Sequence, residues 1–236
     1  MYCVSECSSS NSFHVLSLSV SLLNAPIGIY GGTFDPIHFG HLRPNLELCE
    51  LFALSHVRFI PSSLPPHRSR PETSVEQRLD MVAKAINTET KFVLDDREIK
   101  RGGTSYMVDT LRSLRQDYPK TPLCLLLGMD AFIGLEHWHH WQQLLTYAHI
   151  IVSQRPESDF NAQARWPKAI QVLYEEHKGN QDSIHQMLCG TIILQPVTQL
   201  SISSTDIRRR LKNKQSVRFL MPESVVNLIR CNDLYK

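Results

Sequence analysis

The sequence predicts an α/β protein with a doubly wound, mostly parallel sheet of Rossmann type, and three observations lead to that prediction. Short apolar runs typical of strands alternate with segments typical of helices from residue 27 onward. The run at 123–127 is apolar throughout, as expected of a strand buried on both faces. Two glycines end the first run and precede a helix-like segment. Such alternation implies helical crossovers, which make neighbouring strands parallel.

Each expected element has its own local signal. Strands are predicted where short apolar runs stand between turn residues, at 27–30, 57–60, 92–94, 123–127, 149–152 and 191–194. Helices are predicted by apolar spacing and by capping residues, at 42–54, 75–87, 105–116, 169–177, 204–214 and 222–230, with further helical segments up to 147. Ser74 with Gln77 forms a capping-box pattern at the start of the helix at 75–87. Thr104 or Ser105 is the expected cap of the helix at 105–116, and Ser204 is the expected cap of the helix at 204–214.

Residues 1–25 differ in composition from the rest of the chain. Seven serines occur in the first 19 positions, and no Lys or Arg precedes Arg43. A secretory signal peptide would begin with positive charge, so that interpretation is not favoured. No apolar run approaches the ~20 residues that cross a bilayer. We therefore expect a poorly ordered extension over 1–25, one domain over 26–236, and no membrane association.

Net charge and cysteine usage indicate in which compartment the protein works and which partners are disfavoured. The chain has 236 residues, 20% charged, with a formal net charge of +2 at pH 7. Its six cysteines form no C-x-x-C pair, and Cys49 and Cys124 stand in apolar segments. Buried free thiols suit a reducing compartment, so a cytoplasmic location is expected. The basic run 208–214 lacks interleaved aromatic residues, which favours a solvated helix face over nucleic-acid binding.

The most informative segment is the turn between the first strand and the first helix, with the sequence GGTFDPIHFGH at 31–41. In a parallel sheet this turn lies at the carboxyl end of the strand, where ligands bind. Glycine lets a ligand approach the backbone, and a helix N-terminus attracts anions. His38 and His41, three residues apart, share one side of the first helical turn and can donate to phosphate oxygens. A metal site is less favoured because zinc-binding helices space their histidines four apart. Purely structural histidines are less favoured because the strand, the two glycines, the histidine pair and the helix occur together in that order.

This segment, together with ISSTDIR at 202–208, resembles the nucleotidyltransferase superfamily that carries a His-x-Gly-His element, here His38 to His41. Within it, the chain is similar to the bacterial nicotinate-nucleotide adenylyltransferases. That narrower resemblance rests on the following segments in the family's order: Pro65-Pro66-His67-Arg68, Ser105-Tyr106, Leu127-Gly128-Met129-Asp130, Trp138 and Arg155-Pro156. It spans residue 27 to the last residue given.

The resemblance implies an adenylyl transfer from ATP to nicotinate mononucleotide, giving nicotinate adenine dinucleotide and pyrophosphate in NAD biosynthesis. It implies that His38 and His41 are the catalytic phosphate contacts and that Arg155 stacks on adenine. The implied ATP-binding set is Gly31, Gly32, Thr33, Phe34, His38, His41, Gly128, Asp130, Arg155, Ser203, Ser204, Thr205 and Arg208. Asp130 is alternatively a helix cap, and Arg208 alternatively a surface cation. Asp35 is expected to brace the turn rather than to react.

The second substrate is expected at Trp138, whose face can stack on a pyridine ring, and at the N–H groups of the helix start near Ser105. Trp141 is expected in the core. The implied mononucleotide-binding set is Pro66, His67, Arg68, Ser105, Tyr106, Met107 and Trp138. Two positions depart from the family's pattern: Met107 stands where a hydroxyl residue is frequent, and His139 where a phenol is common. These departures leave the choice between acid and amide mononucleotides open.

Mg²⁺ is the implied cofactor, bound mainly through ATP phosphates and water, and no protein metal ligand is predicted. The alternatives within the superfamily are an enzyme that prefers nicotinamide mononucleotide and a phosphopantetheine adenylyltransferase, the latter leaving Trp138 unexplained. A non-catalytic nucleotide-binding regulator is the alternative from another class, and it would be expected to lack His41, Ser204 or Arg208. A monomer or a homodimer is expected.

Overall fold

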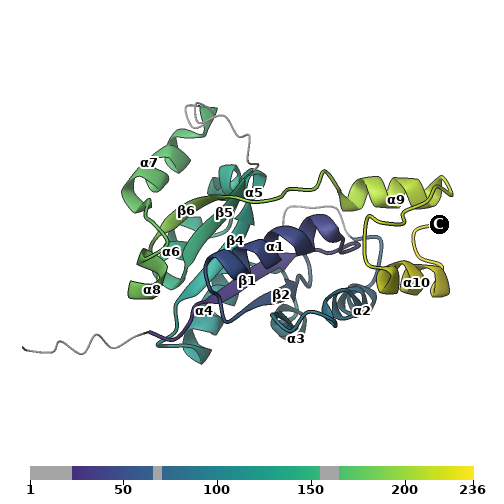
Figure 1. Cartoon of the computed structure of the whole chain (residues 1–236), viewed down its shortest axis with the longest axis horizontal. Helices are drawn as coiled ribbons and strands as arrows, with labels where there is room; N and C mark the ends of the chain where they lie inside the picture. Colours follow the sequence, from purple (N-terminus) through teal and green to yellow (C-terminus); the bar gives the residue numbers. More distant parts are fainter. Residues whose placement is uncertain (1–22, 66–70, 155–164) are drawn as a thin grey trace, which may run out of the picture.

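The computed structural model describes residues 23–65, 71–154 and 165–236, and these build a single six-stranded parallel sheet (Figure 1). The strand order is β3-β2-β1-β4-β5-β6. The strands are β1 (Ile27–Gly32), β2 (His56–Pro61), β3 (Phe92–Leu94), β4 (Leu123–Gly128), β5 (His149–Gln154) and β6 (Ile192–Pro196). All six predicted strands are confirmed, and so is the parallel, doubly wound sheet.

Helices connect successive strands and cover both faces of the sheet (Figure 1). They are α1 (Phe39–Leu51), α2 (Val75–Ile86), α3 (Arg97–Arg101), α4 (Met107–Asp117), α5 (Met129–Ile133), α6 (Leu144–Tyr147), α7 (Lys168–His177), α8 (Ser183–Gln186), α9 (Ser204–Lys212) and α10 (Glu223–Cys231). Two single 3₁₀ turns, η1 (Leu135–His137) and η2 (Trp141–Gln143), lie between α5 and α6.

Strand β4 explains why both faces need helices. Its side chains alternate between two apolar clusters: Cys124 and Leu126 pack in one, whereas Leu123, Leu125 and Leu127 pack in the other. The first cluster is completed by residues of α1, α2 and α10, and the second by residues of α4, α5, α6 and α7. Because successive strand residues point to opposite faces, a run that is apolar throughout must be covered on both sides.

Several helix boundaries differ from the predicted ones. Helix α1 begins at Phe39, directly after the cap position His38, and not at residue 42. The cap of α9 is Ser203, whose hydroxyl accepts from the Asp206 N–H, so the prediction of Ser204 as cap is wrong. The cap position of α4 is Tyr106 rather than residue 104 or 105. These differences amount to one to three residues, since helix boundaries are the least specific part of a sequence pattern.

The strand order places a crevice between β1 and β4. From β1 the chain proceeds outward to β2 and β3, then returns to the other side of β1 at β4. At such a reversal the connecting helices leave in opposite directions, and the carboxyl ends of the two strands stay open to a ligand. Residues 197–203 run from β6 past α5 to α9, which brings the 202–208 motif toward the start of α1 (Figure 1). The fold therefore unites both motifs at one edge of the sheet.

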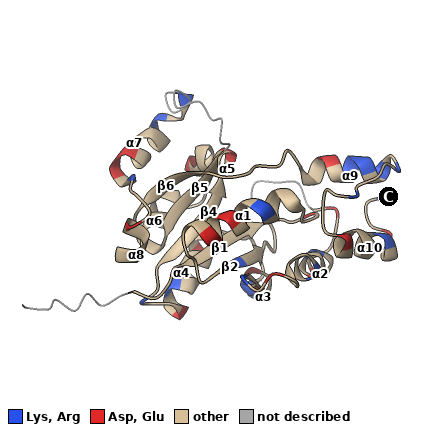
Figure 2. Ribbon diagram, viewed as in Figure 1, with Lys and Arg blue, Asp and Glu red and all other residues tan. Residues whose placement is uncertain are grey.

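The cations of α9 are partly offset by two carboxylates that they share. Arg209 and Arg210 pair with Asp206, and Lys212 pairs with Glu72. The blue segments of Figure 2 mark these cations beside the acidic residue of the same helix.

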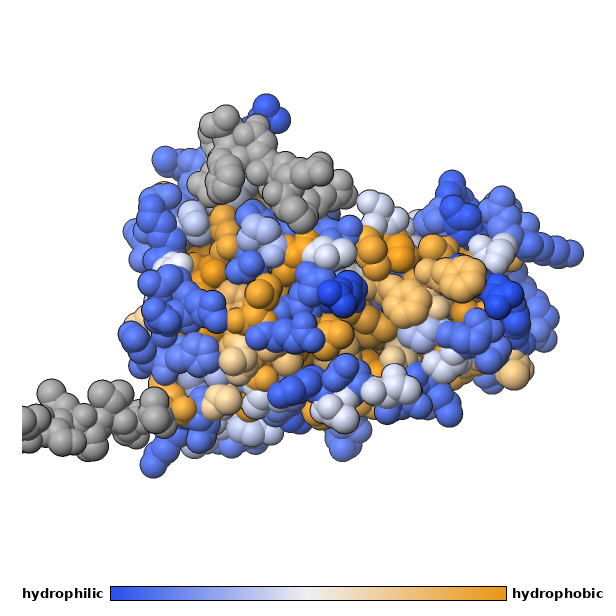
Figure 3. All heavy atoms as spheres, viewed as in Figure 1, coloured by the Kyte–Doolittle hydropathy of each residue, from blue (hydrophilic) through white to orange (hydrophobic). Residues whose placement is uncertain are grey.

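Figure 3 shows apolar side chains over the middle of the same face, surrounded by mostly polar residues. No helix in the described ranges is long and apolar enough to cross a membrane.

We expect removal of residues 1–25 to leave both the activity and the melting temperature unchanged. Residues 1–22 lie outside the described part of the chain, and Asn24 and Ala25 are exposed. The Asn24 side chain donates to the Thr121 hydroxyl (3.2 Å), a surface contact whose loss removes little stability. Thermal unfolding and turnover of the shortened chain test this, and a clear loss of either would mean that the segment packs on the domain.

Candidate active site

A cleft of about 990 Å³ opens at the carboxyl ends of β1 and β4. This volume is at the upper end of the range of about 300–1,000 Å³ that is usual for ligand sites. Every predicted site residue that the structure describes lines it: Gly31, Gly32, Thr33, Phe34, His38, His41, Ser105, Tyr106, Met107, Gly128, Asp130, Trp138, Ser203, Ser204, Thr205 and Arg208. Pro66, His67, Arg68 and Arg155 lie outside the described residues.

The two glycines at the end of β1 stand close against neighbouring side chains. A Cβ on Gly31 would lie 2.5 Å from the Met107 methyl group, and one on Gly32 would lie 2.8 Å from the Phe34 ring. Both distances are far below contact range, so a side chain at either position would displace a wall of the cleft. The absence of side chains at these positions therefore leaves room for Met107 and Phe34 in the cleft wall, and the expected role in ligand approach stays a prediction.

His38 and His41 form a stacked pair at the start of α1. Their ring centroids are 3.7 Å apart with an interplanar angle of 26°. The His38 backbone N–H donates to His41 Nδ1 (3.2 Å), so a neutral His41 carries its proton on Nε2. The edge-on Phe34 ring, with its centroid 5.4 Å from that of His41, fixes the orientation further. The pair is thus preorganised, as the spacing of three residues predicts.

His38 is a neutral hydrogen-bonding group at physiological pH. Only 4% of its surface is exposed, and burial lowers its pKa to about 4. Its Nδ1 atom has no hydrogen-bond partner among the described residues. A buried polar atom without a partner is costly, which makes it a marker of a ligand contact. His38 can therefore bind a phosphate oxygen through a hydrogen bond rather than through charge.

The start of α9 closes the other side of the cleft. Ser203 caps the helix, and the Ser204 hydroxyl donates to the Pro36 carbonyl (2.9 Å). Arg208 donates through Nη1 to the Asp35 carbonyl (2.7 Å) and through Nε to the Glu72 carboxylate (3.1 Å). A guanidinium has five N–H donors, so these two contacts leave donors for a phosphate. Two helix N-termini, those of α1 and α9, thus meet at one turn.

Asp35 and Arg78 hold the turn at residues 33–36 in place through hydrogen bonds. The buried Asp35 carboxylate accepts from the Glu72 N–H and the Thr73 hydroxyl, which supports the predicted bracing role. Arg78, 1% exposed, was not predicted; it donates to the carbonyls of Thr33 (2.9 Å) and Ser62 (2.6 Å). It stands on the apolar stripe of α2, four residues before Val82, and a charge in that stripe is the signal that could have revealed it.

Aromatic and apolar side chains form the end of the cleft near α4. Trp138 is half-buried, and the exposed His139 ring lies against Tyr106 with centroids 4.3 Å apart. Ser105 does not cap α4; its hydroxyl accepts from the Ser63 N–H (2.8 Å) and ties the β2 loop to this end. Trp141 is only half-buried, so the prediction that it is a core residue is correct in part.

Glu98 is a further carboxyl group in the cleft wall that was not predicted. It is 3% exposed and accepts from the Thr110 hydroxyl (2.5 Å). Burial raises its pKa, while hydrogen bonds from Thr110 and Ser105 act in the opposite direction. Helix α3, which carries Glu98, was not predicted because its charged sequence lacks apolar periodicity.

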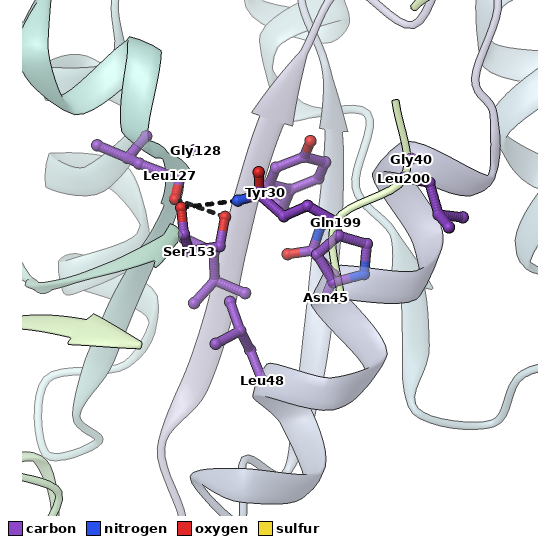
Figure 4. Close-up of a pocket in the computed structure, with 11 residues that line it drawn as sticks. Tyr30, Gly40, Asn45, Leu48, Leu127, Gly128, Ser153, Gln199 and Leu200 are labelled. Carbon is purple, nitrogen blue, oxygen red and sulfur yellow. Dashed lines mark hydrogen bonds between the residues drawn. The ribbon is translucent and has the colours of Figure 1, made fainter. Parts of the chain in front are cut away.

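A smaller hollow of about 140 Å³ adjoins the main cleft between α1 and the sheet (Figure 4). Tyr30 and Asn45 line it from β1 and α1. The Gln199 amide donates to the Ser153 carbonyl (3.0 Å), and the Ser153 hydroxyl donates to the Leu127 carbonyl (3.1 Å). Gly40 and Gly128 belong to both spaces. The hollow is therefore a side chamber of the same site, lined by both polar and apolar residues.

Comparison with known proteins agrees with this geometry. The Cytidylyltransferase-like family model matches residues 29–210. A relative from Aeromonas salmonicida, named a probable nicotinate-nucleotide adenylyltransferase, is 44% identical over 216 residues, which cover 91% of this chain and 99% of the relative. A protein of the same name from Methylococcus capsulatus is 44% identical over 211 residues, covering 89% of this chain and 99% of that protein.

Solved structures share the fold. The Plasmodium falciparum nicotinic acid mononucleotide adenylyltransferase, in structures complexed with APC and with NaAD, aligns with a TM-score of 0.67. The alignments cover 90% of this chain and 98% of that protein, at 19% and 20% identity. At such low identity this likeness concerns the fold, whereas the relatives at 44% identity concern the family. The chain belongs to the cytidylyltransferase-like family and, within it, to the nicotinate-nucleotide adenylyltransferases.

Proposed function

We propose that the chain transfers the adenylyl group of ATP to nicotinate mononucleotide in the described cleft. The observation that carries this proposal is the convergence of two helix N-termini and the His38–His41 pair at one end of a cleft whose other end is aromatic. The mononucleotide 5′-phosphate oxygen attacks the α-phosphorus of ATP, and the bond to pyrophosphate breaks. Nicotinate adenine dinucleotide and pyrophosphate are the products.

The phosphate end stabilises charge and requires no covalent intermediate. His38 and His41 donate to the oxygens of the ATP phosphates, and the start of α9 with Ser203, Ser204 and Thr205 receives the leaving pyrophosphate. Arg208 supplies positive charge beside it. Because the donors are held by packing before ATP binds, little reorganisation is needed during transfer. Asp130, exposed in the first turn of α5, is assigned to the ATP ribose, and the side chamber near Gln199 to the adenine base.

The opposite end is assigned to the nicotinate ring. Trp138 provides a stacking surface, and the N–H groups at the start of α4 receive the carboxylate. Met107 offers no polar donor, so recognition of the carboxylate at this position rests on the backbone. Pro66, His67 and Arg68 remain assigned to the mononucleotide, and Arg155 to adenine, by family resemblance.

Mg²⁺ is proposed to arrive with ATP and to be held by phosphate oxygens and water. Within the described ranges, no three His, Cys, Asp or Glu side chains come together to hold a metal ion. Asp35, the carboxylate of the phosphate turn, is already engaged by hydrogen bonds. We therefore assign no protein ligand to the ion. When bound, Mg²⁺ neutralises phosphate charge and favours departure of pyrophosphate.

We also propose a cytoplasmic location, no nucleic-acid partner, and a monomer or homodimer. The four cysteines in the described ranges are free thiols, which suits a reducing compartment. The cations of α9 share the carboxylates of Asp206 and Glu72, and no aromatic residue is interleaved among them, which favours a solvated helix face over a polyanion site. Size-exclusion chromatography with light scattering determines the oligomeric state.

A pyrophosphate-release assay with the acid and the amide mononucleotide tests the function. We expect release with ATP and nicotinate mononucleotide, and much less with nicotinamide mononucleotide. The reverse preference would assign the amide substrate, for which the apolar Met107 side chain and His139 are the residues to examine. ATP binding without release with either mononucleotide would favour a non-catalytic regulator.

A further inference from the structure

Asp35, in the turn at residues 33–36, is hydrogen-bonded to Tyr235, which lies 200 residues away in the chain. The Tyr235 hydroxyl donates to Asp35 Oδ1 (2.6 Å), the same oxygen that accepts from the Thr73 hydroxyl (2.6 Å). The other oxygen, Asp35 Oδ2, accepts from the Glu72 N–H (2.8 Å). Three donors from two distant segments therefore hold one buried carboxylate.

Tyr235 is built into the interior rather than attached to the surface. It is 6% exposed and lies in the same apolar cluster as Met81 of α2. Burial, together with the Asp35 carboxylate, raises the pKa of the Tyr235 hydroxyl, so it remains a donor at any physiological pH. Its backbone has a positive φ of 64°, a conformation that costs a non-glycine residue energy and persists only where surroundings enforce it.

Two arginines anchor the backbone carbonyls of the same turn. The Asp35 carbonyl accepts from Arg208, and the Thr33 carbonyl accepts from Arg78. Within a planar trans peptide the N–H points opposite to the carbonyl, so a bound Thr33 carbonyl determines the direction of the Phe34 N–H. The carboxylate thus belongs to a turn whose carbonyls are anchored by two arginines, and Tyr235 holds it from within the apolar cluster.

We propose that Tyr235 is a positioning residue for adenylyl transfer, acting through Asp35 on the phosphate-binding turn. This inference rests on the proposed function, since the turn is taken to receive ATP. Tyr235 touches neither substrate; its effect is to keep the donors of the turn aligned. A hydrogen bond to a buried carboxylate is stronger than one between neutral groups, which gives a single hydroxyl this influence.

The variant Tyr235→Phe tests the inference because it removes the hydroxyl and retains the ring. We expect kcat/KM for ATP to fall about tenfold, the scale of a lost hydrogen bond to a charged group. The KM for the mononucleotide should not change. Tyr147→Phe is the matched control, since its hydroxyl meets Arg112 at the exposed surface, and it should behave as the unmodified chain. Thr73→Val removes the other hydroxyl from Oδ1 and should repeat the ATP defect, which provides a second route should Tyr235→Phe not fold.

Binding of a non-hydrolysable ATP analogue, measured by calorimetry, separates this inference from the proposed function. If the unmodified chain binds the analogue but transfers no adenylyl group, the function fails, while weaker binding by Tyr235→Phe would still support the positioning role. The inference is overturned if Tyr235→Phe and Thr73→Val bind the ATP analogue and use ATP as well as the unmodified chain does. An equal loss for both substrates, accompanied by a lower melting temperature, overturns it as well, because that pattern indicates a purely structural residue.

Discussion

Replacing His41 with alanine should lower turnover with ATP by about 10²–10³, the range found when one donor to transition-state charge is removed. Nδ1 of His41 is engaged by the His38 N–H, and the ring is held between His38 and Phe34. The imidazole is therefore oriented before ATP binds, and alanine removes one of the donors at that end of the cleft. Single-turnover measurements of pyrophosphate release at saturating mononucleotide give the magnitude.

The loss must be separated from an effect on folding. His41→Ala also removes the acceptor of the His38 N–H at the start of α1, so a stability loss of about 1 kcal/mol is expected. His185→Ala in α8, outside the residues that line the cleft, is the matched control and should retain full turnover. Near-normal turnover in a folded His41→Ala chain would exclude the phosphate role.

The sheet was predictable because its signals are local. Continuous apolar runs such as 123–127 and the turn at Gly31-Gly32 identify strands without knowledge of their neighbours. Helix α3 was missed for the complementary reason. Its residues Arg97–Arg101 are charged, and the helix depends on tertiary contacts, such as that between Glu98 and the Thr110 hydroxyl. Propensity and periodicity contain no information about such a contact.

The site shows the same division. The His38–His41 pair and the 202–208 motif are contiguous segments, and the strand order explains why they meet. Arg78 and Tyr235 contact the same turn, but their partners are 45 and 200 residues away in the chain. Arg78 interrupts an apolar helix stripe, which is a weak local signal; Tyr235 gives none. The groups that touch a ligand were therefore easier to predict than the groups that hold them in place.

Trp138→Ala should chiefly weaken use of the mononucleotide and leave ATP affinity intact. Trp138 is half-buried in the cleft wall beside His139, at the end opposite the His38–His41 pair. Loss of aromatic stacking costs ~1–3 kcal/mol by analogy with base–aromatic contacts, and the small, charged nicotinate ring favours the lower end. We therefore expect about a tenfold rise in the mononucleotide dissociation constant, since about 1.4 kcal/mol corresponds to one factor of ten.

Trp141→Ala provides the matched control, because Trp141 packs against the same apolar cluster as Trp138 but does not line the cleft. If Trp138 acts only through packing, the two variants should lose similar stability and bind both substrates less well. If it stacks on the ring, only Trp138→Ala should show the selective defect, at a melting temperature no lower than that of Trp141→Ala. Calorimetric binding of each substrate alone, measured beside thermal unfolding of both variants, distinguishes these outcomes. If the mononucleotide affinity of Trp138→Ala is unchanged, Trp138 does not stack on the pyridine ring. The N–H groups at the start of α4 would then be the principal contacts that recognise the mononucleotide.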